Sequence, residues 1–381
     1  MLAGLPCATS APRLPTDDSE VLERLPGRAA NSPLRALRAQ REALRREPGN
    51  AALALAVAQG LFNATAAEGD PRYIGQAQAA LAPWWTLADP PADIRVVRAK
   101  LHQFEHRFDA ARADLEAVVR AQPAHGEAWS WLAALAMVQA RYDDARAACT
   151  QMAPLAHPVI GVACTAAADS LSGQAMPAAE RLSQALATAP VAGPAEQLWA
   201  LTRLAEIQAR LGQAAKAESS YKTALALGRA DVYLQSAYAD FLLDQGRPAE
   251  VLALLAGQER SDLLLLRLAI AAKATGAAQA KGWADALAAR FAAAAQRGDS
   301  SHQKEASRFA LAVRGDTRAA LRDAVANYAV QLEPADARAL LEAALAAGDR
   351  RAAEPALLWL RQNKVQDQIL QGLAQRLEAV K

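Results

Sequence analysis

Five alanines recur at nearly regular intervals along the middle of the 381-residue chain. They follow one another in steps of 34, 33, 39 and 32 residues, at Ala111, Ala145, Ala178, Ala217 and Ala249. A period of this length is typical of arrays in which each repeat is one helical hairpin. A small residue at a fixed position lets the two helices of a hairpin cross closely. The sequence therefore predicts a continuous helical array, with one short insertion around Val191 to Pro194.

The composition favours such an array over a single globular core. At 381 residues the chain exceeds the length at which one hydrophobic core keeps growing. Hydrophobic residues make up 52% of the sequence but aromatic residues only 5%, so the apolar content is mostly alanine and leucine, which are strong helix formers. A net charge of +2 gives no single-sign field that would attract nucleic acid. We therefore expect an all-α solenoid without a nucleic-acid partner.

The segment 126–159 carries the clearest repeat signature. Trp129, Leu132, Ala133, Ala136 and Ala145 lie at the spacing W-x2-L-G-x2-Y…A. In this the chain resembles the tetratricopeptide repeat family, and in particular exported bacterial members of unknown role. Similar spacings occur over 92–125 and 198–229. The resemblance implies a right-handed superhelix of antiparallel helix pairs that covers most of 33–363.

The repeat register divides the chain into three parts. Residues 1–30 are interpreted as a signal-peptide remnant with an N-terminal segment, and 31–363 as a solenoid of roughly nine to ten helix-pair units. Residues 364–381 are expected to form a capping helix that places Ile369, Leu370, Leu373 and Leu377 near one face. In such an array each unit contacts only its neighbours, so we expect the terminal helix to shield the last unit from water.

The first eleven residues are uncharged and give way to the polar segment Pro12 to Glu20. This pattern resembles the end of a signal peptide that lacks its basic start, as if the start codon were placed too late. We therefore expect export, with the periplasm as the destination and the cytoplasm as the alternative. The rest of the chain holds no run near the roughly 18 to 20 apolar residues that a membrane span needs, so no integral membrane segment is predicted.

Cys149 and Cys164 are predicted to lie on consecutive antiparallel helices, joined by the turn at Pro154 to Pro158. Cys149 is about five residues before this turn and Cys164 about six after it, so the two should lie at similar heights. In a reducing cytosol they would be ordinary small buried residues, whereas in an exported protein they would pair. They are therefore the candidate disulfide.

The run from His102 to His106 reads H-x-x-E-H, the zinc-binding helix of one class of metalloproteases. The repeat register instead places these residues at the exposed end of a helix, and the surrounding mixed fold of those enzymes is not predicted. The sequence also lacks a glycine-rich phosphate loop and a G-x-S-x-G elbow. We therefore expect no metal, no cofactor and no catalytic site.

In the tetratricopeptide family, fixed positions on the first helix of each unit line the concave surface. Transferred to this chain, those positions give the candidate groove residues Lys100, Gln103, Met137, Trp199, Thr202, Glu206, Tyr238 and Phe241. The alternative for the aromatic residues is packing between repeats. The resemblance implies a non-catalytic scaffold or adaptor that binds a peptide or helical segment of a protein partner in an apolar groove. A second interpretation is an envelope-assembly or secretion accessory that binds glycan or outer-membrane partners, and no oligomeric state is predicted.

Overall fold

The computed structural model describes residues 33–296 and 302–379, and every regular element in these ranges is helical. This confirms the predicted all-α solenoid. The segment expected to hold a signal-peptide remnant lies outside the described residues. The helix pairs in the described ranges are α2 (Ala51–Glu68) with α3 (Arg72–Ala80), α5 (Ala92–Phe104) with α6 (Phe108–Ala121), α7 (Gly126–Val138) with α8 (Tyr142–Met152), α9 (Pro158–Ser170) with α10 (Ala175–Thr188), α11 (Pro194–Arg210) with α12 (Ala214–Ala226), α13 (Val232–Asp244) with α14 (Pro248–Leu254), α15 (Asp262–Thr275) with α16 (Ala280–Gln296), α17 (Gln303–Arg308) with α18 (Thr317–Tyr328), and α19 (Pro334–Ala347) with α20 (Arg350–Gln362).

Five further pieces complete the described chain. Helix α1 (Pro33–Arg46) packs on α2, and α4 (Ala82–Trp85) is a single turn. Helix α17 continues directly into the π-helical stretch η2 (Phe309–Arg314), a short 3₁₀ turn η1 (Ala153–Leu155) follows α8, and α21 (Gln368–Glu378) ends the array. No helix of the described ranges is long and apolar enough to cross a membrane.

Small residues at the fourth position of the second helix let each pair pack closely. Ala111, Ala145, Ala178 and Ala217 are all completely buried, as the repeat predicted. Ala249 is exposed, and Val251 occupies the buried fourth position of α14 instead. The predicted register was therefore wrong by two residues in this pair, because α14 begins at Pro248 and not earlier.

Polar caps define where many helices begin. The side chains of Asn50, Asp231 and Asp367 each accept a hydrogen bond from the backbone N–H three residues later, at 3.1, 2.8 and 3.0 Å. Gly69 ends α2 with φ of +68°, and a Cβ atom there would collide with Ser261. Only glycine both adopts this positive φ without strain and lacks the Cβ atom that would collide, so the end of α2 can pack against Ser261.

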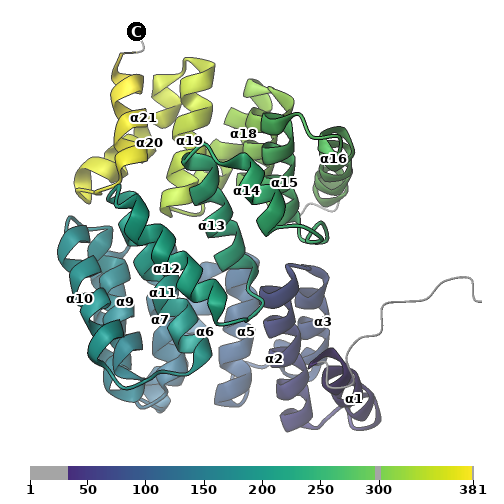
Figure 1. The fold of residues 1–381 in the computed structure, drawn as a ribbon. Helices are drawn as coiled ribbons and strands as arrows, with labels where there is room; N and C mark the ends of the chain where they lie inside the picture. The colour runs from purple at the N-terminus through teal and green to yellow at the C-terminus, as the bar shows by residue number, and fades with distance from the viewer. Residues whose placement is uncertain (1–32, 297–301, 380–381) are drawn as a thin grey trace, which may run out of the picture.

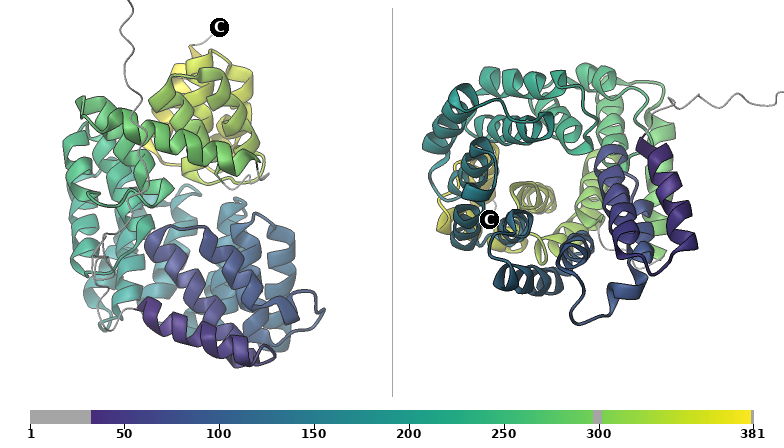
Figure 2. Two further views of the ribbon diagram at one scale, coloured as in Figure 1. Left: turned by 90° about the vertical axis from the view of Figure 1, so that its right-hand side faces the viewer. Right: turned by 90° about the horizontal axis from the view of Figure 1, so that it is seen from below.

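The array coils back on itself, so that its later units lie on its earlier ones (Figures 1 and 2). The indole N–H of Trp359 donates to Tyr142 Oη at 3.0 Å, although the two residues are 217 positions apart. The backbone N–H of Leu332 donates to the carbonyl of Val138 at 2.9 Å. The expectation that each unit contacts only its neighbours is therefore wrong, because the superhelix brings a second turn onto the first.

Helix α21 joins these two turns and does not cap a free end. The Gln366 side chain, just before it, accepts from the N–H of Ala175 at 2.8 Å, and Gln368 donates to the carbonyl of Leu211 at 3.2 Å. Leu370, Leu373 and Leu377 are buried as predicted, whereas Ile369 is 39% exposed. Ile369 faces a pocket between the turns, because it lies one residue off the buried face.

Candidate functional site

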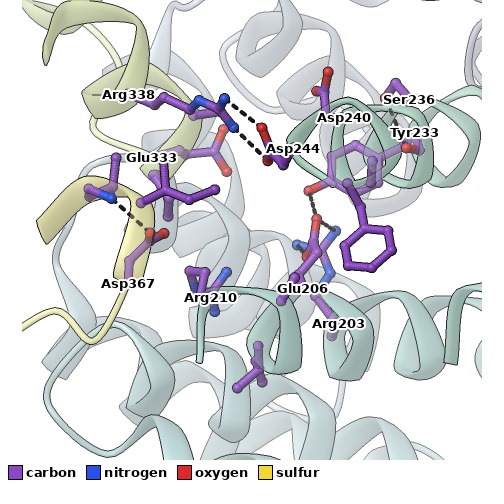
Figure 3. A pocket seen from close by; sticks show the side chains of 18 of the residues that line it. Arg203, Glu206, Arg210, Tyr233, Ser236, Asp240, Asp244, Glu333, Arg338 and Asp367 are labelled. Carbon is purple, nitrogen blue, oxygen red and sulfur yellow. Dashed lines mark hydrogen bonds and ion pairs between the residues drawn. The ribbon is translucent and has the colours of Figure 1, made fainter. Parts of the chain in front are cut away.

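A pocket of about 330 Å³ lies on the inner side of the superhelix, enclosed by α11, α13, α15, α17, α19 and α21 (Figure 3). All but α21 are the first helices of their pairs, so the pocket forms where the inner faces of successive units converge. On α13, Tyr233, Ser236, Asp240 and Asp244 contribute to the lining. These positions follow the helical repeat, so one stripe of α13 faces the pocket.

Twelve charged side chains line the pocket, and for this reason we call it the charged pocket. They comprise six cations and six carboxylates: Arg203, Arg210, Arg267, Lys304, Arg308 and Arg338 with Glu206, Asp240, Asp244, Glu305, Glu333 and Asp367. Apolar side chains such as Leu171, Ile207 and Phe241 line the rest, so the lining is mixed, whereas the sequence predicted an apolar groove. Most of these charges form ion pairs with one another, so much of the lining is held in place before anything binds.

Asp240 is shared by two arginines in the pocket lining. Arg267 donates to its two carboxylate oxygens at 3.1 and 2.6 Å, and Arg308 donates to the same oxygens at 3.0 and 2.8 Å. Although burial alone would raise the pKa of Asp240, the two guanidinium groups hold that pKa far below its usual range. Asp240 therefore stays ionised and fixes α13, α15 and α17 relative to one another.

A second ion pair joins α19 to α13. Arg338 on α19 donates to Asp244 on α13 at 2.8 and 2.7 Å, in the bidentate arrangement that favours arginine over lysine. On α11, Arg203 pairs with Glu206 at 3.1 Å, and its guanidinium lies 4.7 Å from the centre of the Tyr233 ring. Tyr233 donates its hydroxyl to Glu206 as well. These contacts close two sides of the pocket.

Arg210 and Glu333 form no ion pair with any described residue. Nη2 of Arg210 donates to the neutral Oγ of Ser170 at 2.7 Å, and its Nε is buried without an acceptor. Glu333 is the residue before α19. Burial, followed by the neighbouring Asp336 carboxylate, raises the pKa of Glu333 above its usual value. Lys304 and Arg203 act on Glu333 in the opposite direction and lower its pKa, but neither forms an ion pair with it. Two side chains of opposite charge thus line the pocket without a direct ion pair to any described residue.

A different arrangement surrounds Lys100 on α5. Its side chain is 2% exposed, donates to Gln59 Oε1 at 2.8 Å and pairs with Glu127. The ammonium nitrogen lies 5.6 Å from the ring centre of Phe62 and 5.5 Å from that of Trp131. We call these five residues the sealed lysine cluster, because the cation is satisfied by the protein itself.

The structure places the predicted groove residues in different environments. Met137, Glu206 and Phe241 line the charged pocket. Thr202 and Tyr238 are buried in the packing between helices, and Trp199 is 36% exposed on α11 outside the pocket lining. Lys100 belongs to the sealed lysine cluster, and the side-chain oxygen of Gln103 is buried without a hydrogen-bond partner.

Sequence reasoning missed most of the charged lining. The transfer of groove positions stopped at the unit that contains α13, so Arg267, Arg308 and Arg338 on the following first helices were not considered. A charged residue on each of three successive first helices was the available signal. Arg210 and Glu333 could not be found in this way, because they lie at the ends of their helices.

The H-x-x-E-H motif does not form a metal site. Helix α5 ends at Phe104, and His106 adopts a left-handed backbone with φ of 58°, so the two histidines do not share a helical face. His102 is buried, with its ring centre 4.8 Å from that of Trp85, and burial lowers its pKa to about 4. The sequence placed these residues at an exposed helix end, which is wrong for His102. Among the described residues, no group of three or more His, Cys, Asp or Glu side chains could hold a metal ion.

Cys149 on α8 and Cys164 on α9 form a disulfide, with their Cα atoms 5.6 Å apart. The separation lies within the range that a disulfide requires. Both residues are buried, so the bridge joins two successive pairs through their shared core.

Comparison with protein families adds an independent observation. Residues 105–158, which cover α6 through α8 and the turn after them, match the family model described as a tetratricopeptide repeat. This part of the chain is thus similar to a tetratricopeptide repeat. Stacked helix pairs of this kind present an extended concave surface.

Among solved structures, the human IFIT1 dimer with PPP-AAAA is similar over 91% of this chain and 87% of that chain, with 14% sequence identity and a TM-score of 0.47. The tetratricopeptide domain of P58(IPK) is similar over 88% of this chain and 96% of that chain, with 14% identity and a TM-score of 0.21. No curated protein sequence matches the chain.

Proposed function

We propose that this protein is a non-catalytic scaffold that binds a protein partner by taking an extended segment of it into the charged pocket. The observation that carries the proposal is the convergence of five first helices and α21 on one preformed pocket. In a tetratricopeptide array these inner faces are the surface on which a partner can contact several units at once. The ion pairs around Asp240 and Asp244 hold the pocket open, and this lowers the ordering cost of binding.

The size of the pocket favours an extended segment over a helix. A helix with its side chains is about 10–12 Å across, and an extended chain is narrower. The pocket volume of about 330 Å³ lies near the lower end of the ~300–1,000 Å³ typical of ligand sites. Of the two kinds of partner segment that the sequence suggested, the extended peptide is therefore the one that we retain.

This function is tested by selecting peptides that bind the protein and measuring their binding to a variant with a blocked pocket. Ala335 is exposed and lines the pocket, so Ala335→Trp should fill it without disturbing the core. Ala215→Trp, at an exposed position on α12 outside the lining, is the matched control. Peptides selected on the full chain from a displayed library should bind the control variant normally and the blocked variant at least tenfold more weakly. Selected peptides that bind both variants equally would place binding elsewhere and reject the proposal.

We also propose that the scaffold works in an oxidising compartment outside the cytoplasm. The buried pair Cys149 and Cys164 supports this, because structural disulfides persist where thiols are not kept reduced. Non-reducing peptide mapping of protein from its native host should recover the two cysteines in one cross-linked peptide pair. Recovery of two free thiols, alkylated without prior reduction, would argue for the cytoplasm instead.

A further inference from the structure

Among the described residues that line the charged pocket, one cation, Arg210, and two carboxylates, Glu333 and Asp367, have no ion-pair partner within 4.0 Å. The other arginines and the lysine of the pocket all lie within 4.0 Å of a carboxylate, as the pairs at Asp240 and Asp244 illustrate. Asp367 is engaged as the N-cap of α21, where it accepts a hydrogen bond from Leu370. Within the described residues, Arg210 has a neutral partner only, and Glu333 has no ion-pair partner.

These two side chains come from different turns of the superhelix. Arg210 is the last residue of α11, and Glu333 precedes the first residue of α19. Figure 3 shows them on different walls around the same open space. Each has the charge that its helix end favours, but that effect contributes only about 0.3–1 kcal/mol and does not require either group to face a pocket.

A ligand with a single charge would satisfy one of these groups and leave the other without a partner. An anion could pair with Arg210, but its carboxylate or phosphate would also approach Glu333, Glu206 and Asp244. A cation could pair with Glu333, but it would face the guanidinium groups of Arg210 and Arg338. A ligand that carries both charges avoids each of these repulsions.

We propose that the charged pocket binds a zwitterionic group, in which a carboxylate pairs with Arg210 and an ammonium or guanidinium group pairs with Glu333. The inference rests on the proposed function, because it specifies the chemistry of the segment that the pocket accepts. The same chemistry has two sources: adjacent basic and acidic side chains of a partner segment, or a free small zwitterion such as a dipeptide. Because Arg210 and Glu333 belong to different turns, the bound group also bridges the two turns.

Calorimetric titration of the full chain with defined peptides tests the inference. The probes are N-acetyl-Lys-Glu-amide, its single-charge analogues N-acetyl-Lys-Gln-amide and N-acetyl-Gln-Glu-amide, and the free dipeptide glycylglycine. Loss of one charge-assisted contact corresponds to a change of about 10- to 100-fold in affinity. We therefore expect a probe with both charges to bind at least tenfold more tightly than either single-charge analogue. Binding of the acetylated peptide indicates a partner segment, and binding of glycylglycine alone indicates a free zwitterion.

Arg210→Gln and Glu333→Gln should each abolish this preference for two charges, whereas Arg120→Gln, on the exposed face of α6, should leave it unchanged. Circular dichroism confirms that each variant is folded before titration. Equal binding of a single-charge probe, or of a short oligonucleotide, would overturn the inference. If none of these probes binds, but selected peptides still bind the full chain and not Ala335→Trp, the inference of a zwitterionic ligand is overturned. The proposed function is retained in that case. Selected peptides that ignore Ala335→Trp would reject the proposed function itself.

Discussion

Two cations on the inner face of the superhelix, Lys100 and Arg210, have opposite environments. Lys100 is 2% exposed and is surrounded by two aromatic rings, an amide oxygen and a carboxylate. Arg210 lines a pocket and has only the hydroxyl of Ser170 as a partner. The protein thus satisfies one cation internally and leaves the other available.

The difference follows from what faces each cation. In the first turn, Phe62 of α2 and Trp131 of α7 pack edge to face with their ring centres 5.7 Å apart and cover Lys100. Around Arg210 the facing helices belong to the second turn and present charged side chains. Charged groups retain water and cannot close a gap as aromatic rings do, so a pocket remains. The comparison is consistent with a structural role for the sealed lysine cluster and with the binding role that we propose for the charged pocket.

Removal of residues 364–381 should have the largest effect, and it should destabilise the charged pocket but not the sealed lysine cluster. The deletion takes away one wall of the charged pocket and the buried side chains of Leu370, Leu373 and Leu377, which together contribute roughly 5 kcal/mol. Hydrogen exchange should show lost protection in α19 and α20 and in the α11 and α13 faces of the pocket. Protection around Lys100 should persist. Uniform loss of protection through α2, α5 and α7 would show that the two regions unfold as one unit.

Asp240→Asn should destabilise the pocket region by about 3 kcal/mol, because Arg267 and Arg308 would lose the carboxylate that they share. The pKa of Asp240 is lowered in the folded state, so its contribution is complete above the unfolded pKa of about 3.9 and is lost as pH falls further. Urea unfolding at pH 7 and in strong acid measures both effects.

The exposed pair of Asp109 and Arg112 gives the control for this variant. Asp109→Asn should change the free energy of unfolding by less than about 1 kcal/mol at either pH. If Asp240→Asn costs no more than this control, the cluster around Asp240 does not stabilise the contact between its helices.

Lys100→Ala should destabilise the first turn by about 2 kcal/mol, since it leaves a cavity between Phe62 and Trp131. Lys100→Met retains the volume and should cost less than about 1.5 kcal/mol. Thermal unfolding of the two variants, together with titration of the pocket probes, checks this. A change in probe affinity on either substitution would contradict the assignment of Lys100 to stability alone.

Glu333→Gln should have the smallest effect and the opposite sign, with a gain of roughly 0.5–1 kcal/mol at pH 7. The pKa of Glu333 is raised in the folded state, so its protonation favours folding below the unfolded pKa, and this advantage is lost as pH rises through the folded pKa. The variant should be less sensitive than the wild type to pH between the acid range and neutrality in thermal unfolding. A loss of stability at pH 7 would mean that Glu333 has a structural partner.

The sequence by itself determined the helical pairs and the placement of the cysteines. The alanine period fixed the close crossing within most pairs because that interaction is local, and only a small side chain fits there. The positions of Cys149 and Cys164 relative to their turn likewise set the height at which the two side chains meet. Both results depend on residues within one or two units.

The charged pocket was decided only by the tertiary structure. It depends on contacts between units that are distant in the sequence, such as the pair of Arg338 with Asp244, whose members are 94 positions apart and follow no repeat. The curvature that brings these residues together accumulates from small rotations between successive units. Those rotations depend on individual packing residues such as Val251, which departs from the alanine pattern. The alanine period reflects residues that the units have in common, whereas the pocket is lined by residues that differ from one unit to the next.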